Sequence, residues 1–246
     1  MLEVCCGSYY DAVQAARGGA KRIELNCGLY LGGLTPSLAS LLLVKRHLPD
    51  LKVIAMVRPR GGGFCYNQED FQVMEEDTRQ LMVHGADGIA FGCLKGDGSI
   101  DLERNALLAG VIHEYGGEAV FHRAFDCTKD PCEAMEQLIG MGVDRVLTSG
   151  QKEKAMEGLG LLKKMQAQYG DQIQLLAGSG INASNARQLM EETGITQVHS
   201  SCKTWSADPT TSMGDVAYSF AGTPYEKCYD VVSPELVRKV LDEIGE

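Results

Sequence analysis

The sequence alternates short apolar runs with longer segments of helical periodicity from one end to the other. Such alternation is typical of consecutive βα units, whose strands form a parallel sheet covered by helices. The eight predicted strands are residues 2–6, 22–26, 52–58, 88–93, 118–122, 144–149, 173–177 and 197–201. The predicted helices are residues 10–17, 36–47, 68–84, 102–115, 131–141, 152–169, 183–193 and 234–243.

A glycine recurs just before every second predicted strand, at Gly19, Gly85, Gly142 and Gly194. Each is expected to adopt the left-handed conformation that ends a helix, where a β-carbon is unfavourable. The 246 residues contain no linker rich in proline, serine or charge. The pattern therefore predicts one domain, residues 1–246, folded as a single (β/α)8 TIM barrel. An open, doubly wound sheet is the structural alternative.

The composition excludes several classes of protein. The 33 acidic against 23 basic residues give a net charge of −10, which argues against a nucleic-acid partner. No apolar run is long enough to cross a membrane, so no membrane partner is expected. The nine cysteines show no Cys-x-x-Cys spacing. They are interpreted as reduced thiols of a cytoplasmic protein rather than disulfides or a structural zinc site.

Strand alternation predicts which side chains enter the barrel. The apolar residues of the first two strands share one parity and are expected to face the helices. This leaves Glu3, Cys5, Glu24 and Asn26 for the interior. A buried carboxylate needs a partner, so we expect Glu24 to meet a cation across the barrel mouth or to take up a proton.

Two further strand ends carry charged side chains. Arg58 and Arg60 follow the third strand, where two guanidinium groups suit a phosphate or carboxylate. His122 and Asp126 follow the fifth strand, where His122 is a candidate acid or base. The structural alternatives are a tight glycine turn after Arg60, and a histidine held by Asp126 or a backbone carbonyl.

The predicted seventh and eighth strands end in small polar residues. Gly178, Ser179 and Gly180 form a loop after one strand, and Ser200 lies at the end of the other. Free amides at this position of a barrel favour a phosphate. A glycine-rich loop alone is weak evidence, and the alternative for Asn182 is a simple helix cap. Residues 202–233 form a much longer connection with the only tryptophan, Trp205. A lid, a binding loop, an oligomer contact and a solvated excursion all remain open for it.

Cys5 and Cys27 end neighbouring strands and are the candidate metal ligands. Soft thiolates suit Cu(I). The alternative is that they are buried cysteines acting as small hydrophobic residues.

The strand-end motifs together resemble the copper homeostasis protein family CutC. The matching segments are residues 3–5, 22–25, 32–37, 57–62, 121–126, 145–150 and 178–180. The resemblance implies a TIM barrel, a cytoplasmic location, a homo-oligomer and a role in copper homeostasis. It also implies copper ligands at the ends of the first two strands. Cys5 matches the first position, whereas the second falls on Asn26, with the cysteine displaced by one residue to Cys27.

Three functional hypotheses follow. The first, from the resemblance, is a copper homeostasis protein that binds Cu(I) through Cys5 and Cys27. The second, from the residues, is an enzyme acting on a small phosphorylated or carboxylated metabolite. In it Arg58 and Arg60 hold the anion, Glu24 and His122 exchange protons, Asp126 orients a neighbour, and the loop 178–180 seats a phosphate. The third is an oligomeric scaffold without chemistry. The expected partner is therefore a small-molecule anion or a copper ion.

Overall fold

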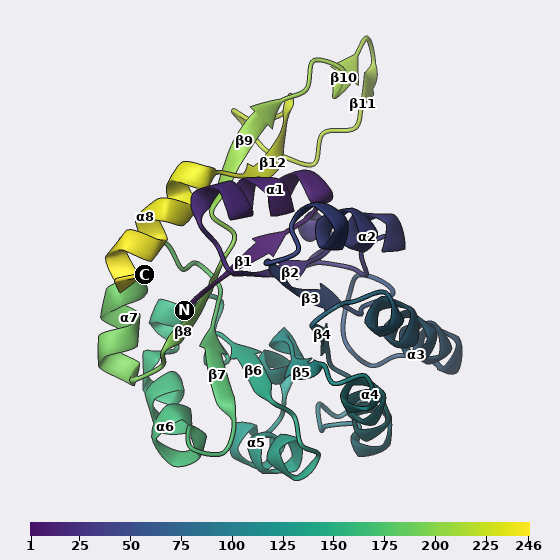
Figure 1. The fold of residues 1–246 in the computed structure, drawn as a ribbon, viewed down its shortest axis with the longest axis vertical. Helices are drawn as coiled ribbons and strands as arrows, with labels where there is room; N and C mark the ends of the chain where they lie inside the picture. Colours follow the sequence, from purple (N-terminus) through teal and green to yellow (C-terminus); the bar gives the residue numbers. More distant parts are fainter.

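A computed structural model describes all residues, 1–246, and shows a closed barrel of eight parallel strands (Figure 1). The strands are β1 (Leu2–Cys6), β2 (Arg22–Leu25), β3 (Lys52–Met56), β4 (Gly88–Phe91), β5 (Glu118–Phe121), β6 (Arg145–Thr148), β7 (Gln174–Ala177) and β8 (Gln197–Ser200). They follow one another around the barrel in sequence order, and β8 pairs with β1 to close it. The (β/α)8 barrel is thus confirmed, and the open sheet is excluded.

Helices surround the barrel as an outer layer (Figure 1). They are α1 (Tyr9–Gly18), α2 (Leu38–His47), α3 (Gln68–Val83), α4 (Leu102–Glu114), α5 (Pro131–Gly140), α6 (Leu159–Tyr169), α7 (Ala186–Thr193) and α8 (Pro234–Ile244). Polar side chains begin several of them: Ser8, for example, accepts a hydrogen bond from the backbone of Asp11. The four repeated glycines all have positive φ, from 76° at Gly142 to 103° at Gly19. The sequence-based expectation for these helix ends is confirmed.

The two faces of the strands pack differently. Val4, Ile23 and Val53 belong to the large apolar core between the barrel and the helices. A small separate cluster that includes Ile54 and Val120 fills part of the barrel interior. The remaining interior positions of β1 and β2 carry buried charged and polar side chains, as strand parity predicts.

Two predicted helices begin later than their periodicity indicates. The predicted helix 152–169 starts only at Leu159, after a short 3-10 turn, Ala155–Glu157. The predicted helix 183–193 starts at Ala186, because Asn182 and Asn185 form a turn in which the Asn185 side chain accepts from the Asn182 backbone. Asparagine side chains compete with helical hydrogen bonds in this way. Both delays leave loops at the carboxyl ends of β6 and β7.

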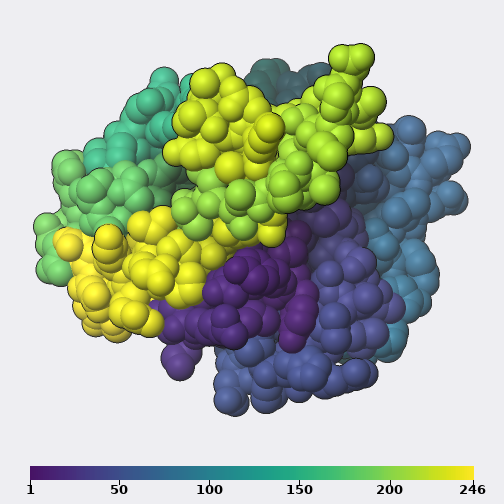
Figure 2. All heavy atoms as spheres, turned by 90° about the horizontal axis from the view of Figure 1, so that it is seen from above, coloured from purple at the N-terminus to yellow at the C-terminus, as the bar shows by residue number.

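The connection after β8 is an ordered arm. Its base is an antiparallel pair, β9 (Lys203–Ala207) and β12 (Cys228–Val232), and its tip carries the short strands β10 (Ser212–Met213) and β11 (Val216–Ala217). Figures 1 and 2 show the arm projecting from the barrel rim beside α1. The Asp11 carboxylate of α1 accepts from the backbone N–H of Val232 at 2.9 Å and ties the base of the arm to the barrel.

No helix combines the length and the apolar character that crossing a bilayer requires.

Candidate functional site

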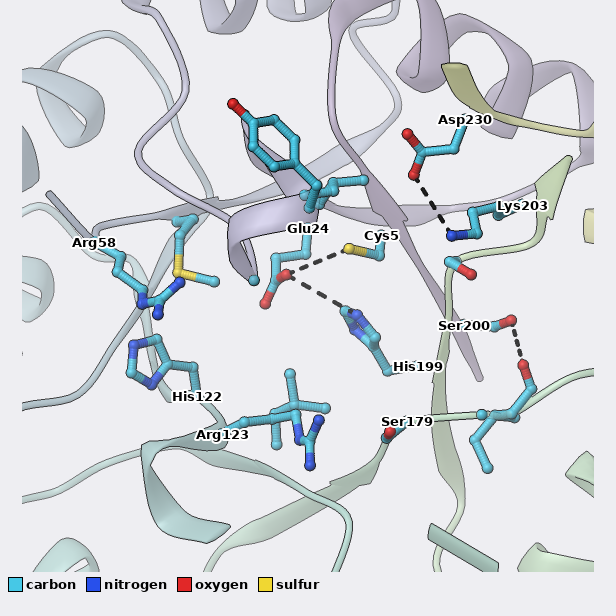
Figure 3. Close-up of a pocket in the computed structure, with 18 of the residues that line it drawn as sticks. Cys5, Glu24, Arg58, His122, Arg123, Ser179, His199, Ser200, Lys203 and Asp230 are labelled. Atoms are coloured by element: carbon cyan, nitrogen blue, oxygen red, sulfur yellow. Dashed lines mark hydrogen bonds and ion pairs between the residues drawn. The ribbon is translucent and has the colours of Figure 1, made fainter. Parts of the chain in front are cut away.

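A half-open cavity of about 610 Å³ lies at the carboxyl ends of the strands. Glu24 from β2, Arg58 after β3 and His122 after β5 all line it, together with Cys5 and His199 (Figure 3). Barrel closure therefore gathers charged side chains that are far apart in the sequence around one hollow. This is the arrangement that the strand-end pattern predicts.

Glu24 has one satisfied and one free carboxylate oxygen. Its Oε2 accepts a hydrogen bond from Asn26 at 2.9 Å, faces the Cys5 thiol at 3.8 Å and lies 4.0 Å from Nε2 of His199. Its Oε1 is buried and has no partner in the protein, and in Figure 3 the carboxyl group extends toward the middle of the cavity. Burial raises the pKa of Glu24, an effect that the nearby His199 only partly opposes. The basic side chain that Glu24 meets across the barrel mouth is therefore His199 of β8.

His199 is held by a second carboxylate on its far side. Its Nδ1 lies 2.9 Å from Oε1 of Glu3, which is only 1% exposed. Burial alone would lower the pKa of His199, but Glu24, Cys5 and Glu3 raise it well above its ordinary value. Glu3 pairs in turn with Arg22 at 2.6 Å. Burial opposes ionisation of Glu3, but His199 and the arginines lower its pKa to about 2.

The pKa of His122 is shifted in the opposite direction to that of His199. Its Nδ1 accepts a hydrogen bond from the backbone N–H of Ala124, so that the proton of the neutral ring resides on Nε2. That Nε2 is buried and has no partner. Burial and the nearby charge of Arg58 lower the pKa of His122 to about 3. One mouth therefore contains a neutral imidazole and an imidazole that favours its charged form.

The structure separates the two arginines of the predicted anion site. Arg58 lines the cavity, but its terminal nitrogens donate to the backbone carbonyls of Leu31, Gly33 and Gly62. Arg60 lies outside the cavity lining and pairs with Asp70 at 2.7 Å. Both arginines follow the end of β3 at Met56, where strand alternation no longer orients side chains, and the hydrogen bonds of both guanidinium groups serve the loops around them. This geometry does not support the expectation that the pair holds an anion.

Asp126 also lies outside the cavity lining, but it binds Arg123, which lines the cavity. It pairs with Arg123 at 2.8 Å and accepts from Thr148 Oγ1 and from the backbone of Ser149. Arg123 itself lines the cavity. Asp126 thus fixes Arg123 and the loop after β6, which agrees with an orienting role and not with a direct chemical one.

The loop after β7 carries backbone donors without a partner beside the cavity. Ser179, Gly180 and Ile181 line it, and their backbone N–H groups make no hydrogen bond within the protein. Ser179 has φ of 81° and Gly180 has φ of 74°, which turns the chain sharply at this point. By contrast, Gly178 lies outside the lining, and the hydroxyl of Ser200 is engaged with the carbonyl of Ile181 at 2.6 Å. The backbone donors without a partner at this side of the cavity therefore belong to residues 179–181.

The structure places Cys27 apart from Cys5. The Cys27 thiol donates to the carbonyl of Thr35 at 3.1 Å, and the residue does not line the cavity. The potential metal ligands that come together are Cys5, Glu24 and His199, whose ligand atoms all lie within 4.8 Å of one another. Only one of these three donors is soft, and burial raises the pKa of the Cys5 thiol. Cu(I) therefore fits Cys5 and His199 but not the hard oxygen of Glu24.

His199 is the residue of this site that the candidate set omitted. Strand parity was the signal that could have identified it, since His199 pairs with Glu3 across β8 and β1 and shares its inward face. Arg123 and the aromatic residues of the arm were also outside that set. Their approach to the cavity depends on loop conformations that periodicity does not encode.

The fold and the site together define a (β/α)8 barrel with a polar cavity at its carboxyl-terminal mouth. The chain belongs to the CutC family, whose model matches residues 1–204. A CutC family protein of Treponema denticola is 41% identical over 244 residues, covering 99% of this chain and 98% of that protein. The human copper homeostasis protein cutC homolog is 42% identical over 203 residues, covering 82% of this chain and 73% of that protein.

Solved structures agree on the architecture. The putative copper homeostasis protein CutC from Streptococcus agalactiae superposes with a TM-score of 0.77 at 29% identity, covering 82% of this chain and 98% of that one. The 3-hexulose-6-phosphate synthase of Salmonella typhimurium has a TM-score of 0.63 at 12% identity, over 99% of this chain and 97% of that one. At that identity the second likeness concerns the fold alone.

Proposed function

We propose that the chain is an enzyme that moves protons on a small anionic metabolite, most simply a phosphate ester, bound in the barrel mouth. One observation carries the proposal: the carboxyl group of Glu24, whose Oε1 has no partner, lies between His122 and His199 at the cavity (Figure 3). The surroundings lower the pKa of His122 and raise that of His199. Environments that push neighbouring pKa values apart are typical of acid–base sites.

Glu24 is the proton carrier in this proposal. Its raised pKa brings it toward the range in which a carboxyl group can both give and take a proton. His199 stabilises the ionised form from one side, and Asn26 holds Oε2 so that Oε1 stays directed at the ligand. Neutral His122 supplies a hydrogen-bond donor at Nε2 beside Arg58, whose charge disfavours protonation of the ring.

The ligand's anionic group binds at the amides of Ser179, Gly180 and Ile181. Three consecutive free N–H groups at a cavity wall suit phosphate oxygens, and the site lies after β7, where barrels commonly bind phosphate. Arg123, held by Asp126, adds positive charge to the same cavity.

A matched pair of variants at Gly180 tests the anion site. Asn and Asp both tolerate positive φ, so Gly180→Asn and Gly180→Asp should fold alike, yet only the second adds a negative charge to the loop. We expect ribose 5-phosphate to raise the melting temperature of the wild type and of Gly180→Asn, but not of Gly180→Asp. Equal stabilisation of both variants would rule out this loop as the anion site.

Glu24→Gln tests the proton-transfer role. The substitution keeps the shape and the hydrogen bond from Asn26 but removes the titrating group. With a substrate from a phosphometabolite screen, we expect kcat to fall by about a hundredfold or more with a small change in KM. Full activity of this variant would contradict the assignment.

Copper binding is the second candidate function, consistent with the names of the relatives. It is supported by the cluster of Cys5, Glu24 and His199 and by the contact of Glu3 with His199, because metal-bound histidines commonly donate their other N–H to a carboxylate. Cys5 would lose its proton on binding, so affinity should rise with pH. Cys5 and His199 would hold the ion in this candidate function, without Cys27.

A competition titration with Cu(I) separates the two cysteines. Cys5→Ser should weaken binding strongly, whereas Cys27→Ser, a matched control, should bind as the wild type does. Unchanged affinity in Cys5→Ser would exclude copper binding at this cluster. Loss of affinity in Cys27→Ser alone would restore the thiol pair that the sequence suggests.

We further propose a cytoplasmic homo-oligomer. Nine free cysteines support the reducing compartment. The apolar side chains at the tip of the arm, with Met213 70% exposed and Val216 59% exposed, support burial against a second copy of the chain.

A further inference from the structure

The arm contributes aromatic side chains to the same cavity. Trp205 and Phe220 line it, together with Tyr30, which lies in the short 3-10 turn Leu29–Leu31 after β2. The rings of Tyr30 and Phe220 stack with centroids 5.1 Å apart, and Trp205 lies 6.5 Å from Phe220. These three residues are called the aromatic wall below. The wall joins the arm to the barrel rim at the entrance of the cavity.

Two of the three side chains of the aromatic wall are exposed to solvent. Tyr30 is 65% exposed and Phe220 is 46% exposed, although both belong to a cavity lining. Large aromatic side chains that line a cavity and stay exposed are typical of ligand contacts. The third ring, Trp205, is instead stacked on Tyr225 with centroids 4.7 Å apart. Polar groups stand beside them: Lys203 lies over the Trp205 ring at 5.0 Å and pairs with Asp230 at 3.8 Å. Both of these side chains also line the cavity.

The aromatic wall comes from the chain segment next to residues 179–181, which are called the anion loop below. The arm leaves the barrel directly after β8, and the free amides of residues 179–181 follow β7, its neighbour in the barrel. One cavity therefore has a donor-rich wall from β7 and an aromatic wall from the arm. Its volume of about 610 Å³ suits a single small molecule.

We propose that the aromatic wall is a subsite for a planar ring, so that the ligand class is a phosphate ester with a ring, such as a nucleoside monophosphate. This inference rests on the anion loop of the proposed function and adds the identity of the organic part. The base of the arm, which carries Trp205, is fixed to the barrel. Five residue pairs join β9 to β12, and the Asp11 carboxylate binds the backbone of Val232. In this proposal the wall selects the ligand, while the barrel performs the chemistry.

Calorimetric titration of the full chain with three probes tests the subsite. The probes are uridine 5′-monophosphate, which has phosphate and ring, ribose 5-phosphate, which lacks the base, and uridine, which lacks the phosphate. We expect the nucleotide to bind about tenfold or more tighter than ribose 5-phosphate, since base stacking on an aromatic side chain contributes on this scale. Trp205 is the only tryptophan, so its emission should also change when the nucleotide binds.

Two variants of the arm make the result specific. Phe220→Ala should bring the nucleotide affinity down to that of ribose 5-phosphate and leave the affinity for ribose 5-phosphate unchanged. Tyr218→Ala is the matched control, because Tyr218 lies two positions away, is 83% exposed and does not line the cavity. It should bind all three probes as the wild type does.

The outcomes separate this inference from the proposed function. Equal affinity for the nucleotide and ribose 5-phosphate overturns the ring subsite and leaves the anion site standing. Binding of uridine as tight as that of the nucleotide, with no binding of ribose 5-phosphate, upholds the subsite and overturns the anion site. No binding of any probe overturns both.

Discussion

Nδ1 of His199 lies 2.9 Å from Oε1 of Glu3, and both side chains are buried inside the barrel. Glu3 also contacts Arg22 and Arg145, so one carboxylate connects the interior charges to the mouth. Because it is surrounded by donors, Glu3 stays ionised and holds His199 in the orientation that faces Glu24. The chemistry of the mouth therefore depends on a residue that does not itself line the cavity.

Removing the charge of Glu3 should destabilise the fold. Glu3→Gln keeps the volume of the side chain but leaves Arg22 and Arg145 without their shared carboxylate. We expect a loss of about 3 kcal/mol or more in the free energy of unfolding, measured by urea denaturation, since unpairing a buried charge is costly. Glu118→Gln, which leaves the Glu3 pairs intact, is the comparison. A smaller loss in Glu3→Gln than in Glu118→Gln would contradict this account.

Because of Glu3, the free energy of unfolding of the wild type should fall at acid pH. The pKa of Glu3 is lowered from 4.5 to about 2, so the folded state gives up this proton more readily than the unfolded chain. The associated stabilisation, about 3 kcal/mol for this shift, is complete above the unfolded pKa and is lost as the pH falls toward 2. Denaturation series between pH 6 and about 2.5 in the wild type and in Glu3→Gln would measure it. The variant should show a shallower decline, and parallel curves would count against the assignment.

His122 should remain neutral far below the usual range of histidine. Its pKa of about 3 means that protonation favours the unfolded chain, so this contribution to stability is present above about pH 6.5 and declines as the pH falls toward 3. Ring signals of His122 in NMR spectra, assigned by comparison with His122→Gln, should not shift between pH 8 and about 5. A titration midpoint near 6.5 would show that burial and the charge of Arg58 do not lower the pKa of His122.

Two glycines near the mouth should respond oppositely to a methyl group. A β-carbon at Gly158 would overlap the carbonyl oxygen of Ser149, whereas one at Gly160 would meet nothing within 4 Å. We expect Gly158→Ala to lose about 2 kcal/mol through overpacking and Gly160→Ala, in exposed α6, to gain about 1 kcal/mol. Thermal unfolding of both variants checks the contrast, and equal melting temperatures would disagree with the loop geometry.

The tip of the arm should control self-association. We expect the double variant Met213→Ser, Val216→Ser to lower the molar mass in light scattering from that of an oligomer to that of a monomer. Leu102→Ser, which alters an exposed apolar residue on α4, is the control and should keep the wild-type mass. A wild type that is already monomeric would end the proposal of a homo-oligomer.

Much of the architecture was predictable from the sequence. The eight strands and the four helix-ending glycines follow from local rules, because periodicity and left-handed turns are properties of short segments. Strand parity likewise placed Glu3 and Glu24 inside the barrel. The same parity places His199 on the inner face of β8, because His199 pairs with the inward-facing Glu3 of β1.

The tertiary structure alone decided which side chains meet. Arg58 and Arg60 looked like a pair, yet the loops turn one toward backbone carbonyls and the other toward Asp70. Cys27 looked like the partner of Cys5, yet its thiol points to Thr35. Sequence sets which residues face inward, since that depends on alternation along a strand. Contacts across the mouth depend on loop paths and on barrel closure, which no local pattern specifies.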